Sequence, residues 1–236
     1  MTADSSVLDD PSSVRGPALV AEMTLRALLR RRLTMAILIG LPILFSFAAR
    51  DSIGQSVRAL VFGTSWAMST AAFFATSSSR EVEPRLRLAG WPQWQLAIGR
   101  IAGLSGLGMT LVALFWVVVA IDHEVRSLGA VWVDLAVTAV VAVGVGTTIG
   151  TLIHREMEGA LVLFLFAGLQ AVVNPFDTFA IFLPFWSSRE LGTFAIDGPS
   201  QGSLVNGLAH GLGVVALCCI ISWAVERRSD LGWPRR

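Results

Sequence analysis

"GAVWVDLAVTAVVAVGVGTTIGTLI", residues 129–153, is an apolar and small-residue run with a single ionisable side chain, Asp134. A helix rises 1.5 Å per residue, so a helical run of this length reaches ~37 Å. The hydrocarbon core of a bilayer is ~30 Å thick, and crossing it takes ~20 apolar residues. The stretch is therefore predicted to be a transmembrane helix.

Five further apolar runs flank this one. They are Leu33–Ala49, Ala59–Ala75, Ile101–Ile121, the interrupted run Ala160–Trp186, and Leu204–Val225. The chain of 236 residues is 54% hydrophobic with a mean hydropathy of +0.66, and no long hydrophilic domain remains outside these runs. The sequence predicts an all-α membrane protein with six transmembrane helices in one domain, residues 33–228, and excludes a water-soluble globular class.

The basic residues are all arginine, and their distribution predicts the orientation in the membrane. Fourteen of the eighteen lie in the N-terminal segment, the second and fourth loops and the C-terminal tail, and four lie on the other side. Short cytoplasmic loops carry the excess of basic residues. Both termini, with the tail 229–236, and the second loop are therefore expected in the cytoplasm.

The absence of lysine excludes one kind of nucleotide site. A P-loop has the pattern GxxxxGK[ST], in which the lysine reaches the phosphates, and this chain has no lysine. If its function uses ATP, the ATP and Mg²⁺ must be bound by another polypeptide. We expect no cofactor in this chain itself, and no ATPase site.

The N-terminal segment divides into a tail and a helix. Residues 1–16 are rich in Ser, Asp and Pro and are expected to be a disordered cytoplasmic tail. Residues 17–32 are predicted to form an amphipathic helix, in which Glu22, Arg26 and Arg30 share one charged stripe. Such a helix can lie among the lipid headgroups. The alternative is a cytoplasmic extension of the first span.

The fifth apolar run is interrupted. Ala160–Val173 reaches only ~21 Å as a helix, and it is followed by Asn174-Pro175 and then by Thr178–Trp186, which contains Pro184. Backbone that breaks at membrane depth must be covered by protein or line a cavity. We therefore predict a broken fifth helix with an external re-entrant hairpin, and expect gating in this region.

Glycine pairs four residues apart occur in three of the predicted helices. They are Gly99/Gly103, Gly146/Gly150 and Gly207/Gly211. Such spacings let helix backbones approach closely in lipid. The pattern predicts close helix packing and identifies no particular partner.

Few ionisable groups lie within the apolar runs. Asp134, Asp177 and His210 fall near predicted outer boundaries, where each is either a water-exposed interfacial residue or part of a proton relay. No histidine or carboxylate pair has a metal-ligand spacing such as HExxH, so no metal site is expected. Adjacent Cys218 and Cys219 cannot meet ordinary disulfide geometry within a helix and are interpreted as packing residues.

Several aromatic residues are candidates for a substrate path. Trp66, Phe73 and Trp116 lie deep in the predicted spans, and Phe176 and Phe185 lie beside the break in the fifth. They either line a cleft for a flat apolar molecule or pack the helices together. Composition leaves both interpretations open.

The loop between the second and third spans, residues 80–95, has the most distinctive composition. Arg85, Leu86, Arg87 and Leu88 alternate charged and apolar groups, and Gly90-Trp91-Pro92 then breaks the chain. Trp and Arg are favoured as anchors in protein interfaces. The loop is interpreted as a compact projection for a soluble partner; the alternative is anchoring at the membrane surface.

The segment Leu88–Arg100, "LAGWPQWQLAIGR", resembles a stretch of ABC-2-type exporter permeases in which a Leu-rich stretch leads through a small-residue turn to W-[EQ]-L-x-x-G-[KR]. The amphipathic N-terminal helix, the six spans and the broken fifth helix followed by Leu183-Pro184-Phe185 are similar to that family as well. The sequence differs from the family pattern at Glu81-Val82-Glu83-Pro84, which has no glycine, and at Val173-Asn174, which stands in place of Ser-Gly.

The resemblance implies a function and an assembly. The loop would be a coupling helix, formed by Arg85, Leu86, Arg87, Leu88, Gly90 and Trp91, that sits in a cleft of an ATP-hydrolysing subunit. A second permease, identical or paralogous, would complete an exporter of hydrophobic or amphipathic molecules in the bacterial cytoplasmic membrane, and the glycine-lined faces suit that pairing. Membrane lipids are expected partners and nucleic acid is not.

Two other functions are compatible with parts of the sequence. A proton-coupled secondary carrier would use Asp134 and His210, although it would normally have carboxylates at the membrane midplane and the sequence has none there. A non-transporting scaffold or sensor subunit would give the external hairpin no clear role.

Overall fold

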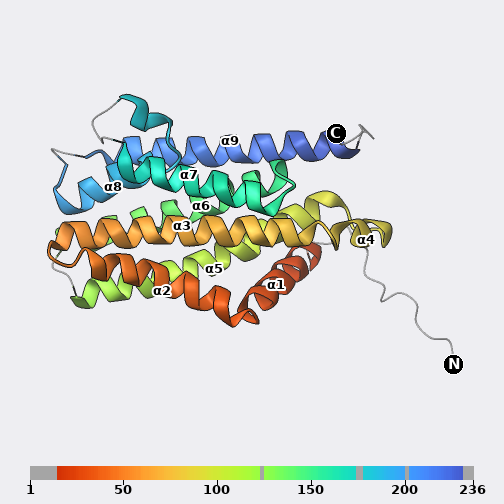
Figure 1. The fold of residues 1–236 in the computed structure, drawn as a ribbon, viewed down its shortest axis with the longest axis horizontal. Coiled ribbons are helices and arrows are strands. Elements are labelled where there is room, and N and C mark those ends of the chain that lie inside the picture. The colour runs from red at the N-terminus through yellow and green to blue at the C-terminus, as the bar shows by residue number, and fades with distance from the viewer. Residues whose placement is uncertain (1–14, 123–124, 174–177, 200–201, 231–236) are drawn as a thin grey trace.

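The computed structural model describes residues 15–122, 125–173, 178–199 and 202–230, which form nine α-helices and one short 3₁₀ helix (Figure 1). In chain order these are α1 (Arg15–Leu29), α2 (Arg32–Ala48), α3 (Ile53–Ser79), α4 (Glu83–Leu88), α5 (Gln93–Asp122), α6 (Leu128–Leu152), α7 (Glu156–Val172), η2 (Thr178–Phe182), α8 (Trp186–Ile196) and α9 (Leu204–Asp230). The prediction of an all-helical protein is confirmed.

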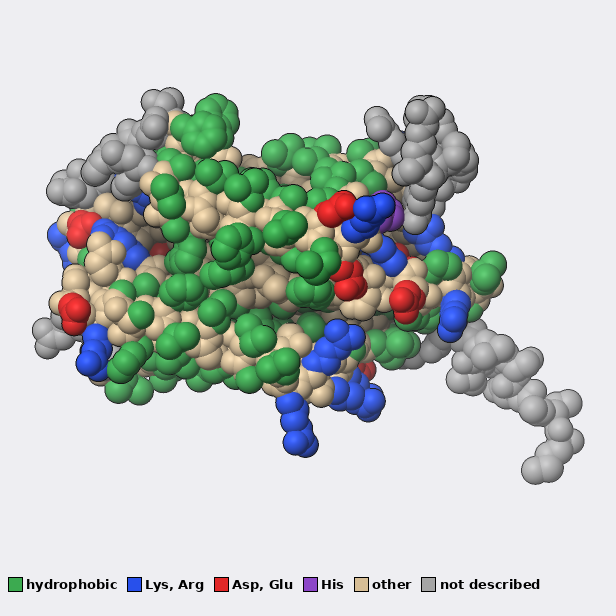
Figure 2. All heavy atoms as spheres, in the orientation of Figure 1, with side chains coloured by type: hydrophobic (Ala, Val, Ile, Leu, Met, Phe, Trp, Pro, Cys, Tyr) green, Lys and Arg blue, Asp and Glu red, His purple; other side chains and the backbone are tan. Residues whose placement is uncertain are grey.

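Helix length and hydropathy identify a multi-pass membrane protein. Four helices, α3, α5, α6 and α9, are long and apolar enough to cross a bilayer, and α1 with α2 would make a fifth crossing if this bent pair is one span. Figure 2 shows charged side chains at one end of the visible face and from just beyond its middle to the other end, with a mostly apolar band between them. This distribution is the one expected if lipid surrounds the middle of the bundle.

Helix α6, which contains the stretch quoted at the outset, lies at the centre of the bundle. It packs against α3, α5, α8 and α9, and its buried residues run from Ala130 to Gly150. The contact with α3 is the closest, since a Cβ at Gly146 would lie 2.2 Å from the carbonyl oxygen of Ser69, and one at Gly150 would lie 2.8 Å from Thr76 Cβ. Two glycines one turn apart therefore let α3 and α6 meet at backbone distance.

The other two glycine pairs are also used within the chain. Gly99 and Gly103 of α5 receive α1, where Cβ atoms would lie 2.6 Å from the Pro17 carbonyl oxygen and 2.7 Å from that of Ala21. Gly207 and Gly211 of α9 face residues of α8 and α6, namely Leu191, Ser187 and Val137. The expectation that these faces suit pairing between two permease copies is therefore wrong, because helices of the same chain fill them.

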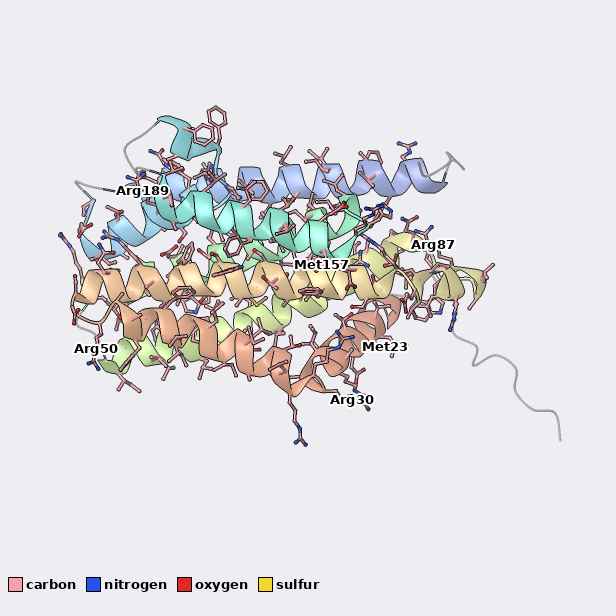
Figure 3. All side chains as sticks on the ribbon, in the orientation of Figure 1. Met23, Arg30, Arg50, Arg87, Met157 and Arg189 are labelled. Carbon is pink, nitrogen blue, oxygen red and sulfur yellow. The ribbon has the colours of Figure 1, made fainter. Side chains whose placement is uncertain are left out.

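The predicted N-terminal helix is present with shifted ends. Helix α1 begins at Arg15 and ends at Leu29 rather than spanning 17–32, and the chain bends by 82° into α2. Glu22 and Arg26 form the expected ion pair on its exposed side. Arg30 lies beyond the helix end, at the bend, and points away from the bundle (Figure 3). Three consecutive arginines at this bend prefer water and headgroups to the apolar interior.

The region of the fifth predicted span consists of separate short elements. Helix α7 ends at Val172, close to the predicted end at Val173, and Asn174, Pro175 and Asp177 lie outside the described residues. The elements that follow, η2 and α8, lie at the opposite end of the molecule from α4 (Figure 1). Helix α8 packs against α6 and α9 and lies over Asp134 in the first half of α6.

Because α3 and α6 approach closely at Gly146, we expect one added methyl group at this position to destabilise the protein. Gly146→Ala places a Cβ against backbone that cannot move aside, and we expect it to lower the free energy of unfolding by ~1–3 kcal/mol. For a chain of this size, each kcal/mol lowers Tm by roughly 2–4 °C. Gly213→Ala in α9 is the matched control, because its Cβ would meet nothing within 4 Å. Thermal unfolding of the two purified variants checks the prediction; equal Tm values would contradict the packing.

Candidate functional site

Helix α4 is a short projection at one end of the molecule (Figure 1). It has six residues, Glu83 and Pro84 occupy its first turn, and none of its residues is buried. Leu88 at its end is 90% exposed, and Arg85 beside it is exposed as well. An acidic residue and a proline at the start favour helix initiation. The result is an exposed surface that combines arginine and leucine side chains, as the sequence predicted.

The turn after α4 depends on Gly90. Its φ is +91°, a conformation that residues with a Cβ rarely adopt. The Gly90 N–H donates to the Arg87 carbonyl at 3.0 Å, and the Trp91 N–H donates to the Leu86 carbonyl at 3.1 Å. These two bonds close the end of α4 before Pro92 leads into α5. The projection is therefore a defined turn of helix with a glycine C-cap.

Arg100 of α5 forms an ion-pair cluster that holds α4 in place. Arg100 is 6% exposed, and its guanidinium pairs with the carboxylate of Glu83. It also donates to the Ser79 hydroxyl at 2.6 Å and lies 3.7 Å from the carboxylate of Glu226 in α9. The cluster of Ser79, Glu83, Arg100 and Glu226 joins α3, α4, α5 and α9 at a single point.

Two members of this cluster lie in or beside a sequence motif, and Glu226 does not. Arg100 closes the W-Q-L-A-I-G-R segment, and Glu83 lies at the start of the predicted coupling loop. Glu226 lies near the far end of the chain with no motif around it, and it comes close to Arg100 because α5 and α9 both pack against α6. Arg80 adds a second tie at this end by donating to the Ile153 carbonyl at 2.7 Å.

Two grooves open next to the cluster. One, of about 300 Å³, lies between α1, α3, α4 and α5, and both Glu83 and Arg100 line it. The other, of about 570 Å³, lies between α5, α6 and α9. Trp94, Glu226 and Arg227 line the second groove, and the Arg227 guanidinium lies 5.0 Å from the centre of the Trp223 ring. Arg100 lines both grooves, so the cluster separates them.

A third cavity, of about 530 Å³, lies at the opposite end of the bundle between α3, α6, α7 and α8. Arg58 and Asp197 line it and form an ion pair at 2.5 Å. Arg189 lines it too and lies at the end of the molecule that is far from Arg87 (Figure 3). We call this space the outer cavity.

Asp134 lines the outer cavity and is 2% exposed. Thr138 Oγ1 donates to its carboxylate at 3.3 Å, and the Ser188 hydroxyl is its second hydrogen-bond partner. Helix α8 covers it so closely that a Cβ at Gly192 would lie 3.1 Å from Oδ2. The interpretation of Asp134 as a water-exposed boundary residue is therefore wrong, because α8 shields it.

His210 has a structural contact of its own. Its Nε2 lies 2.9 Å from the Ile181 carbonyl oxygen, and its ring meets that of Trp186 edge-on with the ring centres 5.1 Å apart. The side chain thereby ties α9 to η2 and to the start of α8. Asp177, the third ionisable candidate, lies outside the described residues.

The aromatic residues predicted to form a substrate path lie in different parts of the structure. Trp66 packs in a cluster with Phe45, Phe62 and Phe164. Phe73 is fully buried against Gly159, and the Trp116 indole N–H donates to the Leu128 carbonyl at 2.9 Å. Phe185 lines the outer cavity, and Phe176 lies outside the described residues. The structure does not bring the four described residues together, and a shared path stays a prediction.

The chain offers little for metal or redox chemistry where it is described. Within residues 15–122, 125–173, 178–199 and 202–230, no group of three or more His, Cys, Asp or Glu side chains is placed to hold a metal ion. Cys218 is buried and Cys219 is exposed, and both are free thiols.

Comparison with known proteins adds no relative. No protein-family model matches the chain, and no curated protein is significantly similar to it. The geometry of the α4 projection, the Arg100 cluster and the outer cavity therefore carries the functional argument.

The Arg100 cluster predicts how firmly α4 is held. Arg100→Gln leaves two partly buried carboxylates without their cation, and we expect a loss of ~2 kcal/mol. Trypsin should then cleave faster after Arg85 and Arg87, because α4 detaches from α5. Arg155→Gln is the matched control, since its ion pair with Glu158 is exposed and worth little. Unchanged cleavage in Arg100→Gln would show that α4 is held by other contacts.

Proposed function

We propose that this chain is the membrane-spanning subunit of an ABC-2-type exporter. The observation that carries the proposal is the α4 projection: an exposed Arg- and Leu-bearing helical turn with a glycine C-cap, attached through Glu83 to the buried Arg100. The subunit would move a hydrophobic or amphipathic molecule out of a bacterial cell with ATP hydrolysed by a separate nucleotide-binding subunit. ATP and Mg²⁺ would bind that subunit, so this chain would have no enzymatic activity of its own.

The proposed topology has six crossings. They are α2, α3, α5, α6, α7 and α9, with α1 at the inner surface and both termini in the cytoplasm. Helices α2 and α7 have 17 residues each, or ~26 Å of helix, which is near the lower limit for a crossing. The 82° bend between α1 and α2 supports a surface position for α1. In this topology η2 and α8 form the external re-entrant hairpin after α7.

In the proposed complex the α4 projection sits in a cleft of the ATPase. Arg85 and Arg87 offer forked donors for carboxylates, and Leu88 and Trp91 offer apolar surface that would be buried on docking. Leu86 and Gly90 position them, because the Leu86 carbonyl and the positive φ of Gly90 close the turn.

Energy would reach the membrane through the Arg100 cluster. A displacement of α4 by the ATPase would act on α5 through Glu83 and on α9 through Glu226, since both carboxylates contact the same guanidinium. A second permease, identical or paralogous, would complete the transporter. Nucleotide binding would then shift the population between inward- and outward-facing states.

The buried carboxylate of Asp134 favours one alternative, a proton-coupled secondary carrier. An ionisable group inside a membrane protein is a functional candidate by default, and Asp134 lines a cavity. Such a carrier would move its substrate with the chain alone and a pH gradient. The exporter would need the ATPase.

The α4 projection predicts the outcome of a coupling measurement. The ATPase encoded beside this chain's gene should hydrolyse ATP faster when reconstituted with the purified chain. Replacing Arg87, Leu88 and Trp91 together by Ala removes the anchors, each worth ~2 kcal/mol at a docked interface, and should weaken the stimulation at least tenfold. Arg155→Ala at the same end of the molecule should stimulate as the unaltered chain does.

Two results would contradict the proposal. Full stimulation by the triple variant would mean that α4 does not couple the two subunits. Transport by the chain alone, driven by a pH gradient without ATP, would establish the carrier instead. If the chain neither stimulates an ATPase nor transports, it is a scaffold or sensor subunit.

A further inference from the structure

The outer cavity has an uneven distribution of charge. Of the two arginines that line it, Arg58 pairs with Asp197. Arg189 lies beside Glu190 and interacts with it electrostatically. Asp134 is the fifth ionisable lining residue, and its hydrogen-bond partners are the hydroxyl groups of Thr138 and Ser188. Among the described residues no arginine or histidine forms an ion pair with it. The cavity therefore has an excess of one carboxylate, and that carboxylate is the most deeply buried.

A second polar residue lines the same cavity. Gln170 of α7 lines the outer cavity, and its side-chain Oε1 is enclosed but accepts no hydrogen bond from the described residues. An unsatisfied buried acceptor costs ~1–3 kcal/mol. A ligand with more than one N–H donor would satisfy Gln170 and Asp134 together.

The rest of the wall is apolar and aromatic. Val61, Phe62, Leu183, Phe185 and Trp186 contribute to the lining. Aromatic rings attract cations through their negative faces, and ~530 Å³ lies within the range of pockets for small molecules. The wall would thus accept the body of an amphipathic molecule while the two acceptors receive its charged head.

We infer that the outer cavity binds a protonated amine with an apolar or aromatic body, whose ammonium group donates to Asp134 and Gln170. The buried carboxylate would gain the cationic partner that it lacks within the described residues, which offsets the cost of its burial. The cavity would bind such an amine whether or not the chain transports it. The identification of such an amine as the exported molecule does rest on the proposed function, and it narrows that function from hydrophobic molecules in general to cationic amphipathic ones.

The test compares two ligands of nearly equal shape. The probes are 1-naphthylmethylamine, protonated at pH 7, and the neutral 1-naphthalenemethanol. The full chain is placed in nanodiscs of zwitterionic lipid, so that anionic headgroups do not bind the amine, and affinity is measured by equilibrium dialysis. The amine should bind at least tenfold more tightly than the alcohol.

Three variants assign the preference to the cavity. Asp134→Asn keeps the shape of the side chain but removes its charge, and should weaken amine binding at least tenfold while leaving the alcohol unaffected. Gln170→Leu should weaken amine binding severalfold. Glu158→Gln removes a carboxylate from the other end of α7 and should change nothing. Equal affinity of the unaltered chain for both probes, or undiminished amine binding by Asp134→Asn, would overturn the inference; should that variant fail to fold, Gln170→Leu decides in the same way.

The outcome is separable from that of the coupling experiment. If the amine binds as expected and no ATPase is stimulated, the inference stands and the proposed exporter function fails. If the ATPase is stimulated and the unaltered chain does not bind the amine in preference to the alcohol, the inference fails and the exporter remains.

Discussion

A single arginine determines whether the exposed helix at one end of the molecule has a defined position. Helix α4 has six residues, too few to be stable by itself in water, and none of its side chains is buried. Its attachment is Glu83, whose carboxylate pairs with a guanidinium that the ends of α3, α5 and α9 enclose. The terminal nitrogens of the Arg100 guanidinium meet the Glu83 carboxylate, the Ser79 hydroxyl and the Glu226 carboxylate. Whatever α4 contacts therefore acts on three long helices at once.

One of those helices lines the outer cavity, and a second contacts the elements that form its wall. Helix α3 carries Ser79 at the cluster and Arg58 at the cavity, and its 27 residues span ~40 Å. Helix α9 carries Glu226 at the cluster and His210, which contacts η2 and the start of α8, at the other end. The two regions are thus joined by continuous helices. A displacement at one end can therefore move the other end by a shift of whole helices, without any change in their internal structure.

The sequence predicts the elements of this fold better than their contacts. The apolar runs predict the positions of the long helices to within several residues, because each run must by itself be long enough to cross the bilayer. The partners of the glycine pairs could not be predicted, since the spacing of Gly146 and Gly150 encodes a close approach but not which helix approaches. Glu226 meets Arg100 only because α5 and α9 pack against the same helix, α6. The sequence places Asp134 near a predicted boundary and leaves open whether it meets water or belongs to a proton relay, and nothing local indicates that α8 folds back over it.

The close seam between α3 and α6 constrains how the outer cavity can open. Gly146 and Gly150 hold these helices at backbone distance, so the wall that they share, with Asp134 on one side and Arg58 on the other, moves as one body. The remaining walls are α7 and α8, and α8 also contacts α9, where the Trp186 ring meets the His210 ring. An opening motion therefore separates α7 or α8 from the α3–α6 pair. Both motions leave the Asp134 carboxylate on the α3–α6 wall, and separation of α8 would expose it to water, so that a cation held there would be released by rehydration of both charges.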